Sequence, residues 1–83
     1  MYSVEVSWTH KPSGVSMDDV LYFDCDEDEK LDMADELCYH WYVNTVAEVA
    51  CELYREFQIE MDGINLDDYI DDYFENCDYI YSF

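Results

Sequence analysis

The stretch YSVEVSWT, residues 2–9, decides how the chain folds, because its polarity alternates cleanly from one residue to the next. Apolar side chains occupy the even positions and polar ones the odd positions: Tyr2, Val4, Val6 and Trp8 against Ser3, Glu5, Ser7 and Thr9. Successive side chains of a strand point to opposite faces of a sheet. The stretch is therefore predicted to be a strand with one face on the core and the other in solvent.

Two further strands are predicted around this one. The segment HKPSG, residues 10–14, contains Pro and Gly as breakers, and VLYFDC, residues 20–25, then predicts a second strand antiparallel to the first. Ser16 followed by Asp19 also has the spacing of a capping box, so a short helix over 17–23 is the alternative. The segment CDYIYSF, residues 77–83, alternates again and predicts a third strand.

Between the second and third strands the pattern is helical. Asp26 is a candidate N-cap, and residues 27–29 place acidic side chains in a first turn, where the helix dipole favours negative charge. Apolar residues then recur at helical spacing: Leu31, Ala34, Leu37, Cys38 and Trp41, followed by Val46, Val49, Ala50, Leu53 and Phe57.

Thr45 followed by Glu48 is a second capping-box signature, so we predict that the helix breaks near Asn44. This gives two helices over roughly 27–43 and 46–60, with one continuous helix as the alternative.

A turn is predicted at Asp62-Gly63, and Asn65 with Asp68 predicts the start of a third helix. In LDDYIDDYFE, residues 66–75, apolar and acidic residues fall on opposite faces of a helix. The predicted fold is a single α+β domain over residues 1–83, with about three antiparallel strands packed on about three helices.

Charge is the outstanding feature of the composition. The 83 residues include 22 Asp and Glu but only three basic residues, Lys11, Lys30 and Arg55, which gives a formal net charge of −19. Because 51% of the residues are apolar and 18% aromatic, we expect a folded domain and not a disordered acidic tail. The negative field repels nucleic acid and anionic membranes and steers the protein toward basic surfaces. We therefore expect a basic protein partner, with no direct nucleic-acid binding and no membrane association.

The sequence gives no sign of catalysis. There is no Gly-rich phosphate loop and no nucleophile elbow, so we expect neither an enzyme nor a cofactor. Cys38 and His40 are only two residues apart and would point to different faces of a helix, so a shared zinc ion is not expected. No signal peptide or membrane span is visible, which predicts a cytoplasmic protein with reduced cysteines: Cys25, Cys38, Cys51 and Cys77.

Rows of carboxylates are the candidate binding residues. Side chains four apart on a helix have Cβ atoms about 5–6 Å apart, and like charges at this spacing cost about 0.2–0.5 kcal/mol per pair. Residues 66–75 carry five carboxylates in ten residues, or about one per 3 Å of helix axis, which approaches the one charge per about 1.7 Å of duplex DNA. The predicted partner-binding residues are Glu48, Glu52, Glu56 and Glu60; Asp67, Asp68, Asp71, Asp72 and Glu75; and Asp26, Glu27, Asp28, Glu29 and Asp32.

In size, charge and aromatic content the chain resembles the small acidic phage proteins that imitate nucleic acid, the anti-restriction and anti-CRISPR DNA mimics. The resemblance implies an inhibitor from a phage or other mobile element, acting in the bacterial cytoplasm. We expect a monomer or homodimer. It implies occlusion of the basic DNA- or RNA-binding surface of a target protein. No motif carries the resemblance, so no residue role is transferred.

Three alternatives remain open. The segment DCDEDEKLDMAD, residues 24–35, resembles a calcium loop, with acids at loop positions 1, 3, 5, 9 and 12: Asp24, Asp26, Asp28, Asp32 and Asp35. It departs from that loop at position 6, where Glu29 replaces the usual Gly, and at position 12, where Glu is usual. The second alternative is an acidic adaptor that binds a basic protein without mimicking nucleic acid. The third is adaptation to high salt, which also favours acidic residues.

Overall fold

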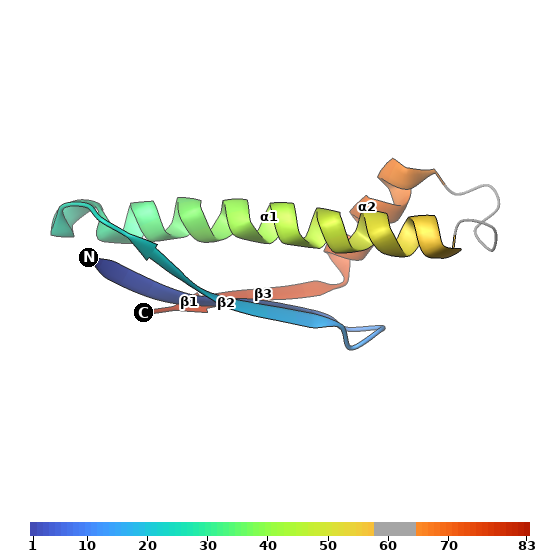
Figure 1. Ribbon diagram of the computed structural model, residues 1–83, viewed down its shortest axis with the longest axis horizontal. Helices are drawn as coiled ribbons and strands as arrows, with labels where there is room; N and C mark the ends of the chain where they lie inside the picture. Colours follow the sequence, from blue (N-terminus) through green and yellow to red (C-terminus); the bar gives the residue numbers. More distant parts are fainter. Residues whose placement is uncertain (58–64) are drawn as a thin grey trace.

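The first predicted strand is the centre of a three-stranded antiparallel sheet. The computed structural model describes residues 1–57 and 65–83. Strand β1 (Tyr2–His10) lies between β2 (Ser16–Phe23) and β3 (Cys77–Ser82), in the order β2-β1-β3. A long helix, α1 (Lys30–Phe57), runs along one face of this sheet, and α2 (Leu66–Glu75) lies beside its C-terminal end (Figure 1). The prediction of an α+β domain with three antiparallel strands is confirmed.

Strand β2 differs from the prediction because it begins earlier. It pairs with β1 along its whole length, from Tyr2 opposite Phe23 to Thr9 opposite Ser16. The alternative of a short helix over 17–23 is therefore wrong, since these residues pair with β1 in the sheet. The hairpin closes through a bond from the Gly14 amide to the His10 carbonyl at 2.8 Å, and Gly14 has the positive φ of 75° that glycine adopts without strain.

Helix α1 is continuous, so the predicted break near Asn44 is wrong and the protein has two helices, not three, within the described residues. The reason is that the Thr45 hydroxyl does not cap a helix. It donates to the Trp41 carbonyl at 2.7 Å, one turn back in the same helix, and accepts from the indole Nε1 of Trp8 at 2.8 Å. The capping-box signature was therefore misleading, and the alternative of one helix is correct.

The start of α1 is close to the prediction. Residues Glu27–Glu29 form a single 3-10 turn, η1, that leads into α1 at Lys30. Asp26 occupies the N-cap position of this turn, but its side chain caps nothing, and its carbonyl accepts from the Glu29 amide at 3.0 Å. Leu31 is 69% exposed although its spacing predicted burial. The buried part of α1 begins only one turn later, at Ala34, so Leu31 precedes the core.

Helix α2 begins as predicted. The Asn65 side chain accepts from the Asp68 amide at 2.8 Å, which is the expected N-cap, and the helix ends at Glu75. The predicted turn at Asp62-Gly63 lies outside the described residues.

The core lies between the sheet and the two helices and is rich in aromatic rings. Trp8 is fully buried against Val46 and Ala50 of α1 and meets Tyr73 of α2 edge-on, with ring centroids 6.2 Å apart. A second cluster joins Val4 and Val6 to Cys38 toward the other end of the sheet: Leu21, Phe23, Trp41, Tyr79 and Tyr81 pack around it. All four cysteines are free thiols, and burial raises the pKa of the Cys38 thiol.

Replacement of Thr45 by Val should destabilise the fold by about 1–3 kcal/mol, because the Trp8 indole N–H would be left buried without an acceptor. Thr45→Ser keeps the hydroxyl and should lose much less. Denaturant unfolding of the two variants tests this, and equal losses would show that the hydrogen bond is not the stabilising contact.

His10 should make stability depend on pH. The residue is 9% exposed; its ring stacks on Tyr73 with centroids 3.7 Å apart and contacts the Ser13 hydroxyl through Nδ1 at 2.7 Å. Burial lowers the pKa of His10 below its ordinary value of 6.5, although Asp72 acts in the opposite direction. The unfolded chain therefore binds the proton more readily, and the free energy of unfolding should fall as the pH drops below about 6.5.

The His10→Phe variant keeps the stacked ring but loses the titrating group. The decrease in unfolding free energy between about pH 7.5 and pH 5.5 should be smaller in this variant than in the parent. Urea titrations at the two pH values measure it. An identical pH dependence in parent and variant would contradict this assignment.

Candidate functional site

Every carboxylate of the described residues is on the surface. Of the 22 acidic residues, only Glu60 and Asp62 lie outside the described ranges, and each of the others is exposed. The predicted partner-binding residues are among them: Asp26, Glu27, Asp28, Glu29, Asp32, Glu48, Glu52, Glu56, Asp67, Asp68, Asp71, Asp72 and Glu75. Within the described residues, the surface is therefore negative along the helices, in the segment that leads into α1 and on the sheet.

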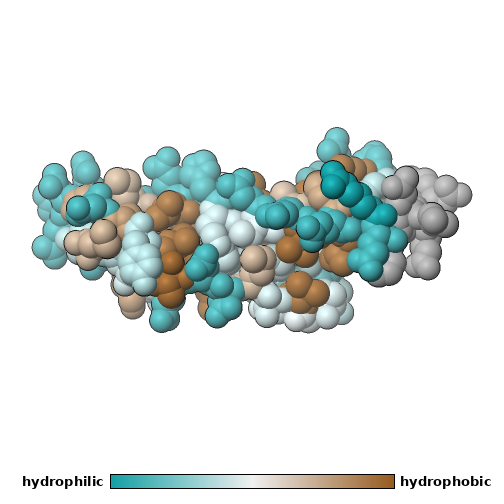
Figure 2. Space-filling model, in the orientation of Figure 1, coloured by the Kyte–Doolittle hydropathy of each residue, from teal (hydrophilic) through white to brown (hydrophobic). Residues whose placement is uncertain are grey.

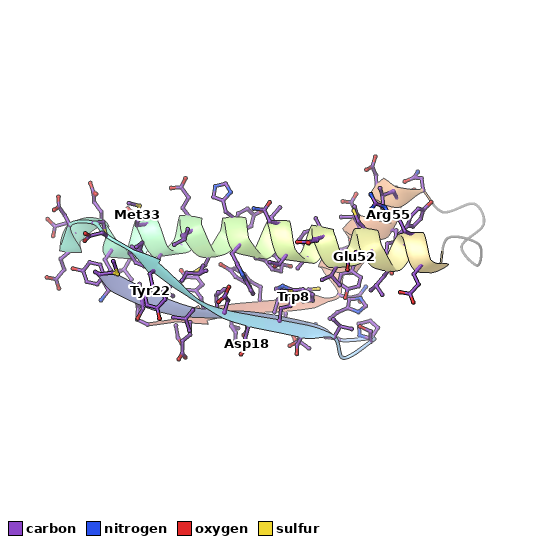
Figure 3. All side chains as sticks on the ribbon, viewed as in Figure 1. Trp8, Asp18, Tyr22, Met33, Glu52 and Arg55 are labelled. Carbon is purple, nitrogen blue, oxygen red and sulfur yellow. The ribbon has the colours of Figure 1, made fainter. Side chains whose placement is uncertain are left out.

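The glutamate row on α1 keeps its helical spacing. Glu48, Glu52 and Glu56 are exposed and belong to one uninterrupted helix, so their Cβ atoms follow at about 5–6 Å. Glu60 lies outside the described residues. Arg55, three residues after Glu52 in α1, is exposed and forms no ion pair within the described ranges; both residues are labelled in Figure 3.

The acidic face of α2 lies close to the end of this row. Tyr69, Tyr73 and Phe74 turn the other face of α2 toward the core, which leaves its five carboxylates in solvent. Since α2 packs beside the C-terminal end of α1, the two acidic surfaces lie at the same end of the molecule (Figure 1). Figure 2 shows hydrophilic side chains along the upper edge of the molecule, over α1 and α2.

The acidic segment 26–32 lies at the opposite end, where α1 begins (Figure 1). The molecule is a rod with extents of 50 × 20 × 17 Å. Its length of 50 Å corresponds to about 15 base pairs of B-DNA at 3.4 Å each. The structure thus distributes the three predicted acidic groups along one elongated body and does not gather them into a single site.

Little positive charge offsets these groups. The N-terminal amine lies 3.9 Å from Asp24, and Lys11 lies 3.4 Å from Asp78. Lys30 sits over the rings of Tyr2 and Phe83, at 4.8 and 4.6 Å from their centroids. None of the predicted partner-binding carboxylates in the described part of the chain forms an ion pair.

The geometry does not favour the calcium-loop alternative. Of residues 24–35, those from Glu27 onward lie in the 3-10 turn or in α1, whereas a calcium loop must wrap its ligands around the ion. No three acidic, histidine or cysteine side chains among the described residues are grouped so that they could hold a metal ion. Cys38 is buried and His40 exposed, so they do not share a face.

One surface was missed by the sequence analysis. The sheet face opposite α1 carries exposed apolar side chains around two carboxylates, at Val20, Tyr22 and Ile80 with Glu5 and Asp18. The polar alternation of residues 2–9 predicted a solvent face there. The predicted second strand began at residue 20 and so left out Asp18, and the register that brings Val20, Tyr22 and Ile80 to one face could not be read from the sequence.

Neither helix of the described residues combines the length and the apolar character that a bilayer crossing requires.

Calcium should have no selective effect on stability. We expect that micromolar Ca²⁺ at constant ionic strength shifts the midpoint of thermal unfolding no more than equal Mg²⁺ does, because no preformed site couples binding to folding. Added NaCl should raise the midpoint by screening the carboxylates. A large shift with Ca²⁺ alone would restore the calcium-loop alternative.

Comparison with known proteins gives no relative from which a function can be taken. No protein-family model, no curated protein and no solved structure matches the chain.

Proposed function

We propose that this protein inhibits a nucleic-acid-handling protein by occupying its basic DNA- or RNA-binding surface as a nucleic-acid mimic. The observation that carries the proposal is the combination of a 50 Å rod with exposed, unpaired carboxylates along its helices. A restriction enzyme or a CRISPR effector of a phage host is the kind of target that the proposal implies.

The spacing of the carboxylates supports mimicry over simple solubility. Four residues of helix rise about 6 Å. Neighbouring phosphates of one DNA strand advance about 3.4 Å along the axis while also winding around it, so they lie roughly twice that far apart in space. A row such as Glu48, Glu52 and Glu56 therefore approximates one phosphate strand. A helix that needed only to be soluble would carry interleaved Lys or Arg, since i,i+4 pairs of opposite charge stabilise it.

The continuity of α1 adds to this argument. A break near Asn44 would have put Asp32 and the row Glu48, Glu52 and Glu56 on two separate axes, whereas one helix of 28 residues holds them at fixed separations along a single axis. The sheet supports this helix from one side through Trp8, Val46 and Ala50. The acidic rows are thus preorganised, which reduces the entropy lost on binding.

The decisive experiment is competition for nucleic acid. The target is first captured from a bacterial lysate. Proteins that bind at low salt and are lost at high salt are the candidates, and they are then identified. A fluorescent duplex and a fluorescent single strand are then bound to it, and the parent protein is added. We expect displacement of at least one of the two probes, because charge neutralisation on the target is the shared basis of both interactions.

Two variants test the acidic rows. Glu52→Gln with Glu56→Gln should fold at least as stably as the parent, because like-charge repulsion is relieved. Asp68→Asn with Asp72→Asn relieves the same repulsion but also removes a negative charge from the first turn of α2, so its stability should stay within about 1 kcal/mol of the parent. Each should compete less well, through slower association with a shallower salt dependence.

A matched control removes two carboxylates that already have a positive partner, Asp24→Asn with Asp78→Asn. It has the same change in net charge and should compete nearly as well as the parent. If both row variants compete like this control, the rows serve only solubility and the mimicry proposal is wrong. Binding without displacement of either nucleic acid would instead indicate an acidic adaptor.

A further inference from the structure

The face of the sheet that turns away from α1 is a second, chemically different surface. The register places Val20 and Ser82 on either side of Glu5, and Asp18 and Ile80 on either side of Ser7. Figure 3 shows Asp18 on the side of the sheet away from α1, whereas Trp8 lies between the sheet and the helix. No described element covers this face (Figure 1).

Three large apolar side chains are exposed on this face, although it is the solvent side of the sheet. Tyr22 is 66% exposed, Ile80 68% and Val20 40%. Together with Glu5 and Asp18 they line a shallow hollow of about 630 Å³. These apolar groups flank the polar side chains of the central strand, Glu5 and Ser7, on both sides. A surface that combines exposed apolar groups with charged ones in this way is suited to contact with another protein.

The charge on this face specifies the kind of partner. Glu5 and Asp18 are diagonal neighbours on adjacent strands, about 7–8 Å apart at Cα. Neither forms an ion pair within the described residues. Lys11 is paired with Asp78 beyond the hollow, so no described cation neutralises them.

A second copy of the chain does not fit this surface. Two such faces packed together would bring Glu5 and Asp18 against carboxylates of the other copy, in an interface that excludes water. Nucleic acid and anionic lipid are excluded by the same charge.

We propose that the open sheet face docks a cationic segment of a protein, with an Arg side chain between the carboxylates of Glu5 and Asp18 and apolar side chains two residues to either side of it on Tyr22 and Ile80, since residues two apart in an extended segment point the same way. Arginine suits this site because its planar guanidinium pairs with carboxylates and stacks on aromatic rings. The inference rests on the proposed function only in that the partner is a basic protein. It adds a contact that depends on side-chain shape and not only on charge.

Two acetylated, amidated peptides of equal charge, Leu-Ser-Arg-Ser-Leu and Gly-Ser-Arg-Ser-Gly, serve as probes for titration of the ¹⁵N-labelled protein. We expect amide shifts on the sheet around Ser7, Val20 and Ile80 with the leucine peptide, and about tenfold weaker binding of the glycine peptide at equal charge. Shifts confined to α1 and α2, or equal affinity for both peptides, would overturn the proposal.

The variant Tyr22→Thr with Ile80→Thr removes the apolar groups and keeps residues that favour strands. It should lose the preference for leucine while the salt dependence of binding stays unchanged, because no charge is removed. The matched control is Leu31→Gln with Tyr39→Gln, which removes one aliphatic and one Tyr side chain of 69% and 57% exposure from α1. This control should bind both peptides like the parent, and a loss equal to that of the sheet variant would count against the site.

Failure of this proposal is distinguishable from failure of the proposed function. The peptide titration uses no nucleic acid, whereas mimicry is judged only by displacement of nucleic acid from the target. A protein that selects the leucine peptide on the sheet but displaces no nucleic acid keeps the docking face and loses mimicry. The opposite pair of results keeps mimicry and loses the docking face.

Discussion

The burial of Trp8 is the constraint on which the rest of the structure depends. Its ring, on the central strand, packs against residues of both α1 and α2, and its indole N–H donates to Thr45 at 2.8 Å. A buried N–H without an acceptor would cost a substantial part of a small domain's stability. The same hydroxyl bonds back to the Trp41 carbonyl, so the contact that anchors the sheet also lies where the helix was predicted to end. The Trp8–Thr45 pair therefore fixes β1 against α1, the helix that carries the glutamate row.

The aromatic core opposes the charge repulsion of the acidic surface. Mutual repulsion of carboxylates favours expansion of the chain, and the described residues supply few cations to oppose it. Large rings bury much apolar area per residue and pack edge-on or stacked, which adds attraction beyond area alone. Tyr42, for example, stacks on Tyr79 at 4.4 Å and meets Phe74 edge-on at 5.4 Å. The aromatic content that distinguished the chain from a disordered acidic tail is therefore what holds its charged helices in place.

The sequence predicted those features that are decided locally. The alternation of residues 2–9 and the Asn65 cap of α2 are set by neighbours along the chain, and both were correct. The break near Asn44 was wrong because the Thr45 hydroxyl accepts a hydrogen bond from Trp8, which is 37 residues away in sequence. A pattern of neighbouring residues cannot predict such a contact. The exposure of all described carboxylates followed from the cost of burying charge. The open sheet face could not be seen, because it needs the register of three strands that lie far apart in the sequence.

The two surfaces proposed for binding differ in what they can discriminate. A field from exposed carboxylates acts over about 10 Å at 0.1 M salt and raises the rate of encounter with any basic surface. Such a field alone would attract many nucleic-acid-binding proteins to a similar extent, since they share the property of being basic. Apolar contacts act only when surfaces touch, and they chiefly slow dissociation. If the helices attract a target and the face with Tyr22 and Ile80 must then fit it, the acidic rows would set how fast the protein binds, and the sheet would set which of the basic proteins it retains.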